Sequence, residues 1–242
     1  MRNLIAIILS LALACVALTT RSFAQDAEPS APAAAAIDSA PPDFNSEIYY
    51  RNKLEVSFDT GCLFYNTPLL LGPLLGDAFN REPRLPNYIL VPMIFSLRWH
   101  LYGIKGRSFW RGNTDFTIGG SYNVIAHGPE SYYAALIGGL RYNFVQPDWR
   151  VVPYAELRGG LGFTDAAQPY QVAHHEWPNG QGQDFTFTFM FGTGVRYNFN
   201  PRYSISTSIE YMHISNAYLS EPKYYNHGVN VVGPAIGLNI AL

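Results

Sequence analysis

A histidine and a serine lie two residues apart near the C-terminus, in the run Tyr-Met-His-Ile-Ser-Asn-Ala at positions 211–217. This run reads as a β-strand, in which alternate residues share one face. The side chains of His213 and Ser215 therefore point the same way, with α-carbons roughly 6.6 Å apart. An imidazole within reach of a hydroxyl can accept its proton and make the oxygen a nucleophile. The spacing predicts a site for nucleophilic serine chemistry.

The neighbouring strand supplies a third residue. If the last two predicted strands form a hairpin in which Tyr211 faces Val232, then His213 lies opposite Asn230. Directly opposed residues have Cβ atoms roughly 5 Å apart. Asn230 could accept a hydrogen bond from one imidazole nitrogen and leave the other nitrogen facing Ser215.

Nucleophilic attack on an ester also needs donors for the charge that develops on the carbonyl oxygen. Asn216 follows Ser215 directly, and the predicted strand breaks beside it at Ala217. Asn216, or a backbone N–H group where the strand breaks, could stabilise this charge.

The elements that position these residues are short segments of alternating character. Eight such segments occur, at about 53–66, 87–101, 114–126, 131–145, 149–164, 183–199, 203–217 and 229–242. Charged residues share one face with Gly, Ser and Thr, whereas the opposite face is apolar or aromatic. A water-soluble sandwich would carry its charges on the outer face. The inverted pattern predicts an all-β fold, an eight-stranded antiparallel outer-membrane β-barrel with lipid outside.

The interior of such a barrel is just wide enough to be filled with side chains. The inward-facing positions collect four acids and four arginines: Glu55, Asp59, Arg98, Arg141, Glu156, Arg158, Arg196 and Glu210. We expect an internal ion-pair network that fills the lumen and excludes an open channel.

The N-terminal region reads as a targeting segment followed by a leader. Residues 1–24 combine an early arginine, an apolar stretch and small residues before a cleavage site, which is typical of a signal peptide. Residues 25–46 are rich in Ala, Pro and Ser without periodicity, which predicts a disordered periplasmic leader. Residues 47–242 then form one transmembrane barrel domain. Because Cys15 belongs to the signal, Cys62 is left without a cysteine partner in the mature chain.

Composition and topology suggest where the barrel works. The formal net charge is −2 and no basic cluster occurs, which argues against nucleic-acid binding. An even number of strands places both termini of the barrel domain in the periplasm. The strand at 203–217 then runs outward, and its parity turns His213 and Ser215 toward lipid. We expect a Gram-negative outer-membrane protein with a site at the outer leaflet.

Two runs near the C-terminus carry a family resemblance. Met-His-Ile-Ser-Asn-Ala at 212–217 and Asn-His-Gly-Val-Asn at 226–230 closely resemble the C-terminal signature of the PagL-type lipid A 3-O-deacylases, the acyloxyacyl hydrolase family. The resemblance implies an outer-membrane esterase that removes the 3-O-linked acyl chain of lipid A in lipopolysaccharide, without a metal or nucleotide cofactor. Carried over by position, Ser215 is the nucleophile, His213 the general base and Asn216 part of the oxyanion hole.

The chain departs from the family at the third position. The family's best-known enzymes carry a glutamate where Asn230 stands here. An amide can orient an imidazole but brings no charge to stabilise the imidazolium. Two alternatives stay open: lower activity with Asn230 in place, or participation of Glu221 from the adjoining loop.

Two other functions fit the same sequence features. A non-catalytic small barrel could bind lipid, adhere or stiffen the membrane, and the same residues could hydrolyse phospholipid. The sequence does not decide whether the barrel forms a homodimer. His174, His175 and Glu176 form a loop cluster without a further spaced metal ligand, and Cys62 reads as a small apolar residue on the lipid face.

Overall fold

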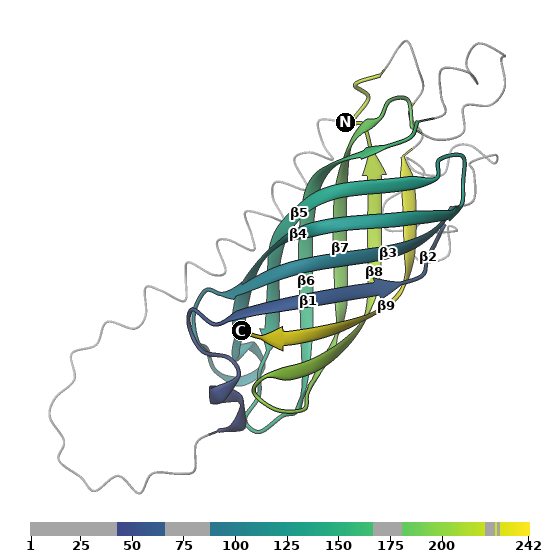
Figure 1. The fold of residues 1–242 in the computed structure, drawn as a ribbon. Coiled ribbons are helices and arrows are strands. Elements are labelled where there is room, and N and C mark those ends of the chain that lie inside the picture. Colours follow the sequence, from purple (N-terminus) through teal and green to yellow (C-terminus); the bar gives the residue numbers. More distant parts are fainter. Residues whose placement is uncertain (1–42, 66–87, 167–180, 221–225, 227) are drawn as a thin grey trace, which may run out of the picture.

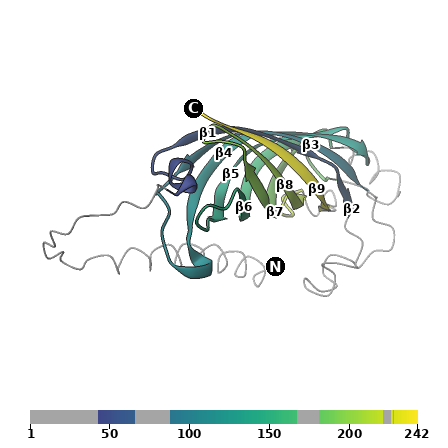
Figure 2. The same ribbon diagram turned by 90° about the horizontal axis from the view of Figure 1, so that it is seen from below.

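The structure is a computed structural model, and it describes residues 43–65, 88–166, 181–220, 226 and 228–242. The predicted signal peptide and most of the predicted leader lie outside this part of the chain. The described strands form one antiparallel sheet that closes on itself, because β1 pairs with both β3 and β9. Figures 1 and 2 show the resulting barrel from two directions. Its elements are η1 (Phe44–Glu47), β1 (Leu54–Gly61), β2 (Leu63–Tyr65), β3 (Ile89–His100), η3 (Ser108–Trp110), β4 (Gly112–His127), β5 (Tyr132–Phe144), β6 (Val151–Thr164), β7 (Phe185–Asn198), β8 (Tyr203–Ser215) and β9 (Val229–Ala241).

The barrel has eight crossings in the described residues, because β1 and β2 are two parts of one crossing. Both parts pair with β3 on one side and with β9 on the other. The interruption at Cys62 lies beside Pro234 of β9, whose carbonyl oxygen accepts from the Cys62 N–H group at 3.1 Å. Proline has no N–H group to return, so the ladder loses one hydrogen bond there. The predicted eight-stranded antiparallel barrel is confirmed, with its first strand interrupted.

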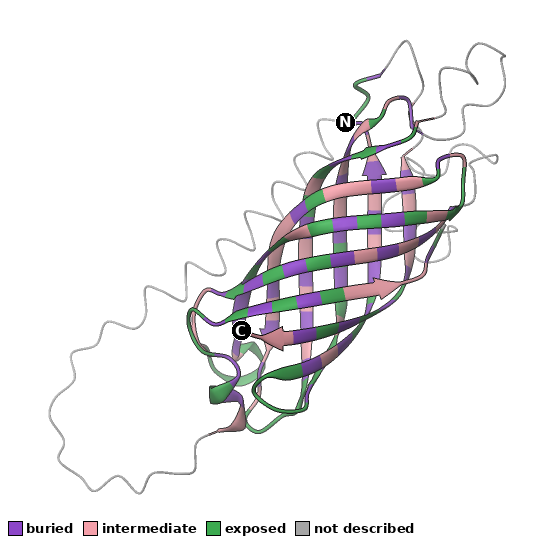
Figure 3. Cartoon of the chain, in the orientation of Figure 1, coloured by how far each residue is buried: buried purple, intermediate pink, exposed green. Residues whose placement is uncertain are grey.

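Burial alternates along the strands, as Figure 3 shows by the change between purple and green. The exposed side chains are large and apolar on most strands, for example Phe95 on β3 at 63% exposure and Leu136 on β5 at 65%. The inward-facing side chains are buried. This arrangement matches an apolar solvent outside and a packed interior. Among the described residues, no helix has the length and apolar character that crossing a membrane requires.

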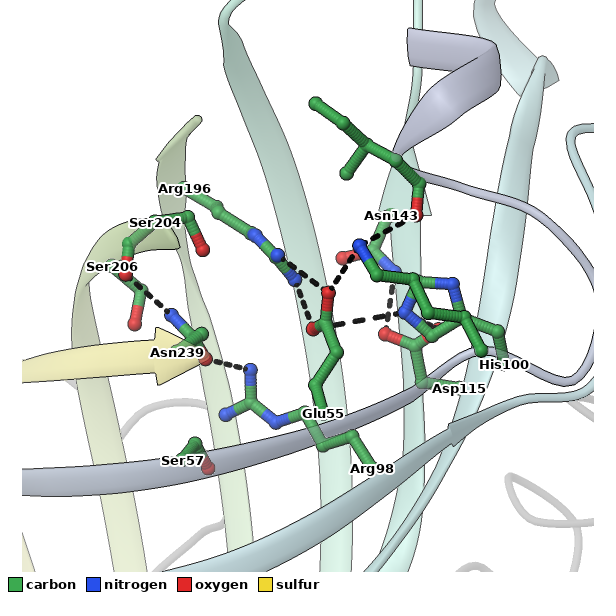
Figure 4. Close-up of polar contacts among 12 residues, drawn as sticks. Glu55, Ser57, Arg98, His100, Asp115, Asn143, Arg196, Ser204, Ser206 and Asn239 are labelled. Atoms are coloured by element: carbon green, nitrogen blue, oxygen red, sulfur yellow. Dashed lines mark hydrogen bonds and ion pairs between the residues drawn. The ribbon is translucent and has the colours of Figure 1, made fainter. Parts of the chain in front are cut away.

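Charged residues fill the half of the lumen nearest η1. Arg196 donates two hydrogen bonds to the Glu55 carboxylate, at 2.7 and 2.8 Å, and Lys53 lies 2.9 Å from the same group. Figure 4 shows this cluster with Arg98, which donates to Asn239 at 2.6 Å. The eight acids and arginines predicted to face inward all do so: Glu55, Arg98, Arg141, Glu156, Arg158, Arg196 and Glu210 are buried, and the Asp59 side chain is 13% exposed.

The other half of the lumen holds a large apolar cluster, which the sequence analysis did not anticipate. Its buried cluster consists of Leu63, Tyr88, Leu90, Ile94, Tyr133, Ile137, Met190, Met212, Ile214, Val229 and Val231. Met212 and Ile214 are the inward-facing neighbours of His213. The strand that carries the histidine and the serine is therefore packed from inside against a hydrophobic core.

A small cover packs at the η1 end of the barrel. It consists of residues 43–49 and the long link between β3 and β4. The buried Asn45 side chain donates to the carbonyl oxygens of Gln146 and Trp149 at 2.8 and 2.9 Å. Arg111, which follows η3 in the link, donates to Asp43 at 2.5 Å. Residues 43–46 thus contact the barrel, although the sequence analysis assigned them to the leader. The ordered domain extends at least to Asp43.

The Asp43 carboxylate joins this cover to the barrel. Burial opposes its ionisation, but the N–H groups of Asp148 and Asn45 and the Arg111 guanidinium together lower the pKa of Asp43 below its ordinary value of 3.8. A carboxyl group whose folded pKa is lowered contributes stability at pH values above the unfolded pKa. That contribution is lost as the pH falls through the folded pKa.

We expect Asp43→Ala to lower the free energy of unfolding by about 1–2 kcal/mol at neutral pH, because it removes a cap and a charge-assisted hydrogen bond. The difference from wild type should shrink as the pH falls through the folded pKa of Asp43, below which the carboxyl group is protonated in both states. Urea unfolding in detergent micelles measures it. Glu47→Gln, an exposed carboxylate of the same helix, is the control. A difference that does not change with pH would contradict this role.

Candidate active site

His213 and Ser215 lie on the outer wall of the barrel at the end of β8. Their side chains are half-buried, whereas the intervening Ile214 points inward and is 2% exposed. Figure 1 shows the β8 arrowhead at the end of the barrel opposite η1. The pairing of β8 with β9 places Tyr211 opposite Val232 and His213 opposite Asn230, as the sequence predicted. The three side chains therefore meet on the same outer face.

Hydrogen bonds connect these three side chains in a chain. The Ser215 Oγ atom lies 3.1 Å from His213 Nε2, and His213 Nδ1 lies 2.9 Å from Asn230 Oδ1. An amide oxygen can only accept, so Nδ1 carries the proton in this arrangement. The lone pair of Nε2 then faces the serine hydroxyl. This is the tautomer that a general base needs.

Two more contacts hold the Asn230 amide. The Tyr211 hydroxyl donates to Asn230 Oδ1 at 2.6 Å, and Asn230 Nδ2 donates to the Gly228 carbonyl oxygen at 3.3 Å. Tyr211 lies two residues before His213 and shares its face of β8. The sequence analysis used it only to set the hairpin register and did not connect it to the site. Its position on the same face of β8 as His213 and Ser215 was the signal that could have linked it to the site.

Inward-facing side chains anchor the backbone on either side of the serine. Thr188 of β7 donates from its hydroxyl to the His213 carbonyl oxygen at 3.1 Å. Gln181 donates from its side-chain amide to the Ile214 carbonyl oxygen at 3.4 Å. Both residues are buried. They hold the end of β8 from within the barrel, and no pattern in the sequence predicts either contact.

Phenylalanine side chains flank the site on its β7 side. Phe187 pairs with Ser215 and Phe189 pairs with His213 across the β7–β8 ladder. Both are half-buried on the outer wall, and the Phe185 and Phe187 rings meet edge to face at 5.3 Å. The serine hydroxyl therefore has an apolar, aromatic neighbour on the face that meets lipid.

The chain turns sharply after Asn216. Ala217 and Tyr218 have φ angles of 52° and 65°, in the left-handed region that side chains other than glycine rarely adopt. Asn216 itself is buried, and its side-chain amide donates to Ser220 Oγ at 2.7 Å. Its backbone N–H group donates to Asn226 Oδ1 at 3.4 Å. The oxyanion role assigned to Asn216 stays a prediction, because this amide already has an acceptor.

The remaining sequence candidates do not join the site among the described residues. Glu221 and the cluster at 174–176 lie outside the described part of the chain. Cys62 is half-buried between β1 and β2, on the first crossing. Within the described ranges, no group of three His, Cys, Asp or Glu residues could hold a metal ion.

The fold and the site together define a small outer-membrane β-barrel with a serine, a histidine and an asparagine in hydrogen-bond contact on its lipid-facing wall. A sequence model of the family described as lipid A 3-O-deacylase (PagL) matches residues 93–239. The chain belongs to this family. The matched region includes Ser215, His213 and Asn230.

Solved structures give more distant likenesses. The crystal structure of the outer membrane enzyme PagL is 15% identical, covers 77% of this chain and 98% of its own, and has a TM-score of 0.46. Neisserial surface protein A is 13% identical with a TM-score of 0.47, covering 78% of this chain and 96% of its own. The outer membrane protein Ail of Yersinia pestis is 12% identical with a TM-score of 0.35, covering 79% of this chain and 100% of its own. No curated protein matched the sequence.

Gly228 lies against the imidazole and offers a geometric test of the site. A Cβ atom on this residue would come within 2.9 Å of His213 Cε1 and 3.5 Å of Ser215 Cβ. We expect Gly228→Ala to shift the imidazole and to lower the reactivity of Ser215 by about tenfold or more, because misplacement by about 1 Å can cost about 100-fold.

The measurement is the rate at which a fluorophosphonate labels Ser215 in detergent-solubilised barrel. Gly120→Ala is the matched control, since a Cβ atom there meets nothing within 4 Å. Equal labelling of the two variants would show that the imidazole position does not govern the serine.

Proposed function

We propose that the protein is an outer-membrane serine esterase that removes the 3-O-linked acyl chain from lipid A. One observation carries the proposal: Ser215, His213 and Asn230 form a hydrogen-bonded chain on the lipid-facing wall. Membership of the lipid A 3-O-deacylase family supports the same conclusion. A polar cluster on a surface that meets lipid is costly, and a catalytic role explains its presence.

The geometry suggests the order of proton transfers. His213 Nε2 takes the proton of the Ser215 hydroxyl as the oxygen attacks the ester carbonyl carbon. The tetrahedral intermediate collapses, the sugar hydroxyl leaves with the proton from Nε2, and an acyl-serine remains. Water then attacks this ester, gives one proton to Nε2, and the fatty acid leaves as Ser215 regains its hydrogen. No cofactor is needed for any of these steps.

Asn216 is the proposed donor to the oxyanion. Its side-chain nitrogen carries two N–H groups, of which one donates to Ser220. In this proposal the second N–H group donates to the carbonyl oxygen of a bound ester. Loss of one oxyanion donor typically lowers the rate by roughly 100- to 1000-fold.

Asn230 determines how strong a base we expect His213 to be. Asn230 orients the imidazole through its oxygen but carries no negative charge to stabilise an imidazolium. We therefore expect slower turnover than a carboxylate at this position would give. Glu221 stays an alternative partner for His213, and its position lies outside the described residues.

The position of the site along the barrel supports a substrate in the outer leaflet. The site lies at the end opposite η1 and the C-terminus, which is the outer end if both termini are periplasmic. Lipid A occupies the outer leaflet of the outer membrane. The aromatic neighbours Phe187 and Phe189 offer an apolar surface for an acyl chain beside the serine.

The test is mass spectrometry of lipid A from permeabilised membranes that carry wild type or Ser215→Ala. We expect wild type to release the 3-O-linked chain and the variant to release less than about 1% as much, because removal of the nucleophile abolishes the acyl-serine route. Thr207→Ala removes an exposed hydroxyl from the same face of β8 and is the control, with wild-type activity expected.

The outcomes separate the candidate functions. Intact 3-O-linked chains in both wild type and Ser215→Ala would overturn the proposal. If wild type instead released fatty acid from phospholipid, the serine chemistry would stand and the substrate would change. If no ester in the membrane were cleaved, the non-catalytic barrel would be favoured.

A further inference from the structure

We propose that Tyr211 is a positioning residue that fixes the Asn230 amide so that its oxygen faces His213. The role rests on the proposed serine chemistry of Ser215. The observation behind it is the 2.6 Å hydrogen bond from the Tyr211 hydroxyl to the same oxygen that accepts from His213 Nδ1.

An asparagine can face an imidazole in two ways. With Oδ1 toward the ring, it accepts from Nδ1–H and leaves the Nε2 lone pair for Ser215. With Nδ2 toward the ring, it donates to Nδ1 and places the proton on Nε2, which can then no longer accept from the serine hydroxyl. The orientation of one amide thus decides whether His213 can act as a base.

The Gly228 carbonyl group selects the productive orientation, and the Tyr211 hydroxyl reinforces it. The Gly228 carbonyl oxygen lies 3.3 Å from Nδ2, and a reversed amide would bring two acceptors together there. The Tyr211 hydroxyl donates to Oδ1, so this oxygen receives two donors at once. Two donors hold this oxygen in place more firmly than the imidazole alone would.

The reach of Tyr211 follows from the strand register. Val232 is its direct partner on β9, and Asn230 is the diagonal neighbour two residues away on the same face. Diagonal neighbours lie about 7–8 Å apart between α-carbons, which an aromatic side chain can span. Tyr211 and Asn230 are both half-buried, so water competes less for the hydrogen bond than on an open surface.

A carboxylate at position 230 would remove the need for this positioning. Both of its oxygens accept, so rotation by 180° changes nothing for the imidazole. Asn230→Asp has the same shape as the amide and tests this difference directly. Tyr211 should therefore matter when residue 230 is asparagine and matter little when it is aspartate.

The first experiment compares four proteins in the lipid A deacylation assay: wild type, Tyr211→Phe, Asn230→Asp and the double variant. We expect Tyr211→Phe to lower kcat by about 10- to 100-fold with little change in KM, a part of the roughly 10⁴-fold cost of a fully wrong tautomer. In the Asn230→Asp background the same change should alter kcat by less than about threefold. Tyr203→Phe, a lipid-facing tyrosine at the start of β8, is the control and should match wild type.

The second experiment reads the tautomer without any substrate. In ¹⁵N-histidine-labelled barrel, with the resonance assigned by a His213→Gln variant, we expect His213 to be protonated at Nδ1 in wild type. Tyr211→Phe should shift the resonance toward a mixture of tautomers. This readout keeps the proposal testable even if lipid A proves not to be the substrate.

Two results would overturn the positioning role. One is an unchanged His213 tautomer and unchanged kcat in Tyr211→Phe. The other is an equal loss of activity in both backgrounds, which would show that the tyrosine contributes packing alone. If wild type and Ser215→Ala were equally inactive while the tautomer still shifted, the proposed function would fail and the positioning role would stand.

Discussion

The lack of hydrogen-bond partners in lipid governs the architecture of this protein. Every backbone N–H and C=O group that crosses the bilayer must be paired within the sheet, so the sheet closes through the β1–β9 and β1–β3 ladders. One exception within the described strands is the step at Cys62, where Pro234 has no N–H group to give. Closure in turn fixes which side chains face lipid and which face the lumen. The position of His213 and Ser215 on the wall follows from that constraint.

Two kinds of side chain fill the lumen, charged ones near η1 and apolar ones near the site, and they stabilise the barrel in different ways. Near η1, buried ion pairs such as Glu55 with Arg196 hold strands together that are distant in sequence. Breaking such a pair leaves a charge without a partner and typically costs about 3–5 kcal/mol. Near the site, an apolar core packs under Met212 and Ile214. That core, with hydrogen bonds from Thr188 and Gln181, holds the end of β8 from inside, beneath His213 and Ser215.

Much of this could be predicted because a strand has a period of two. Parity alone identified the inward charges, and one pairing, Tyr211 with Val232, brought His213 opposite Asn230. What could not be predicted depends on contacts between residues that no pattern links. Asn45 reaches a turn about a hundred residues away, and the Asn216 amide turns to Ser220 after a left-handed bend. The Tyr211 hydrogen bond needs a particular rotamer, which neither parity nor register specifies.

A histidine and a serine in hydrogen-bond contact on the outer wall change what concentration means for the proposed reaction. His213 and Ser215 open toward the lipid phase and not toward a lumen or an aqueous cleft. Their encounters with a lipid substrate would therefore depend on lateral diffusion within one leaflet. They would also depend on the mole fraction of that substrate among the surrounding lipids. Diluting the membrane with inert lipid would slow such encounters at a constant bulk concentration. Anything released there would enter the same two-dimensional phase and accumulate around the barrel.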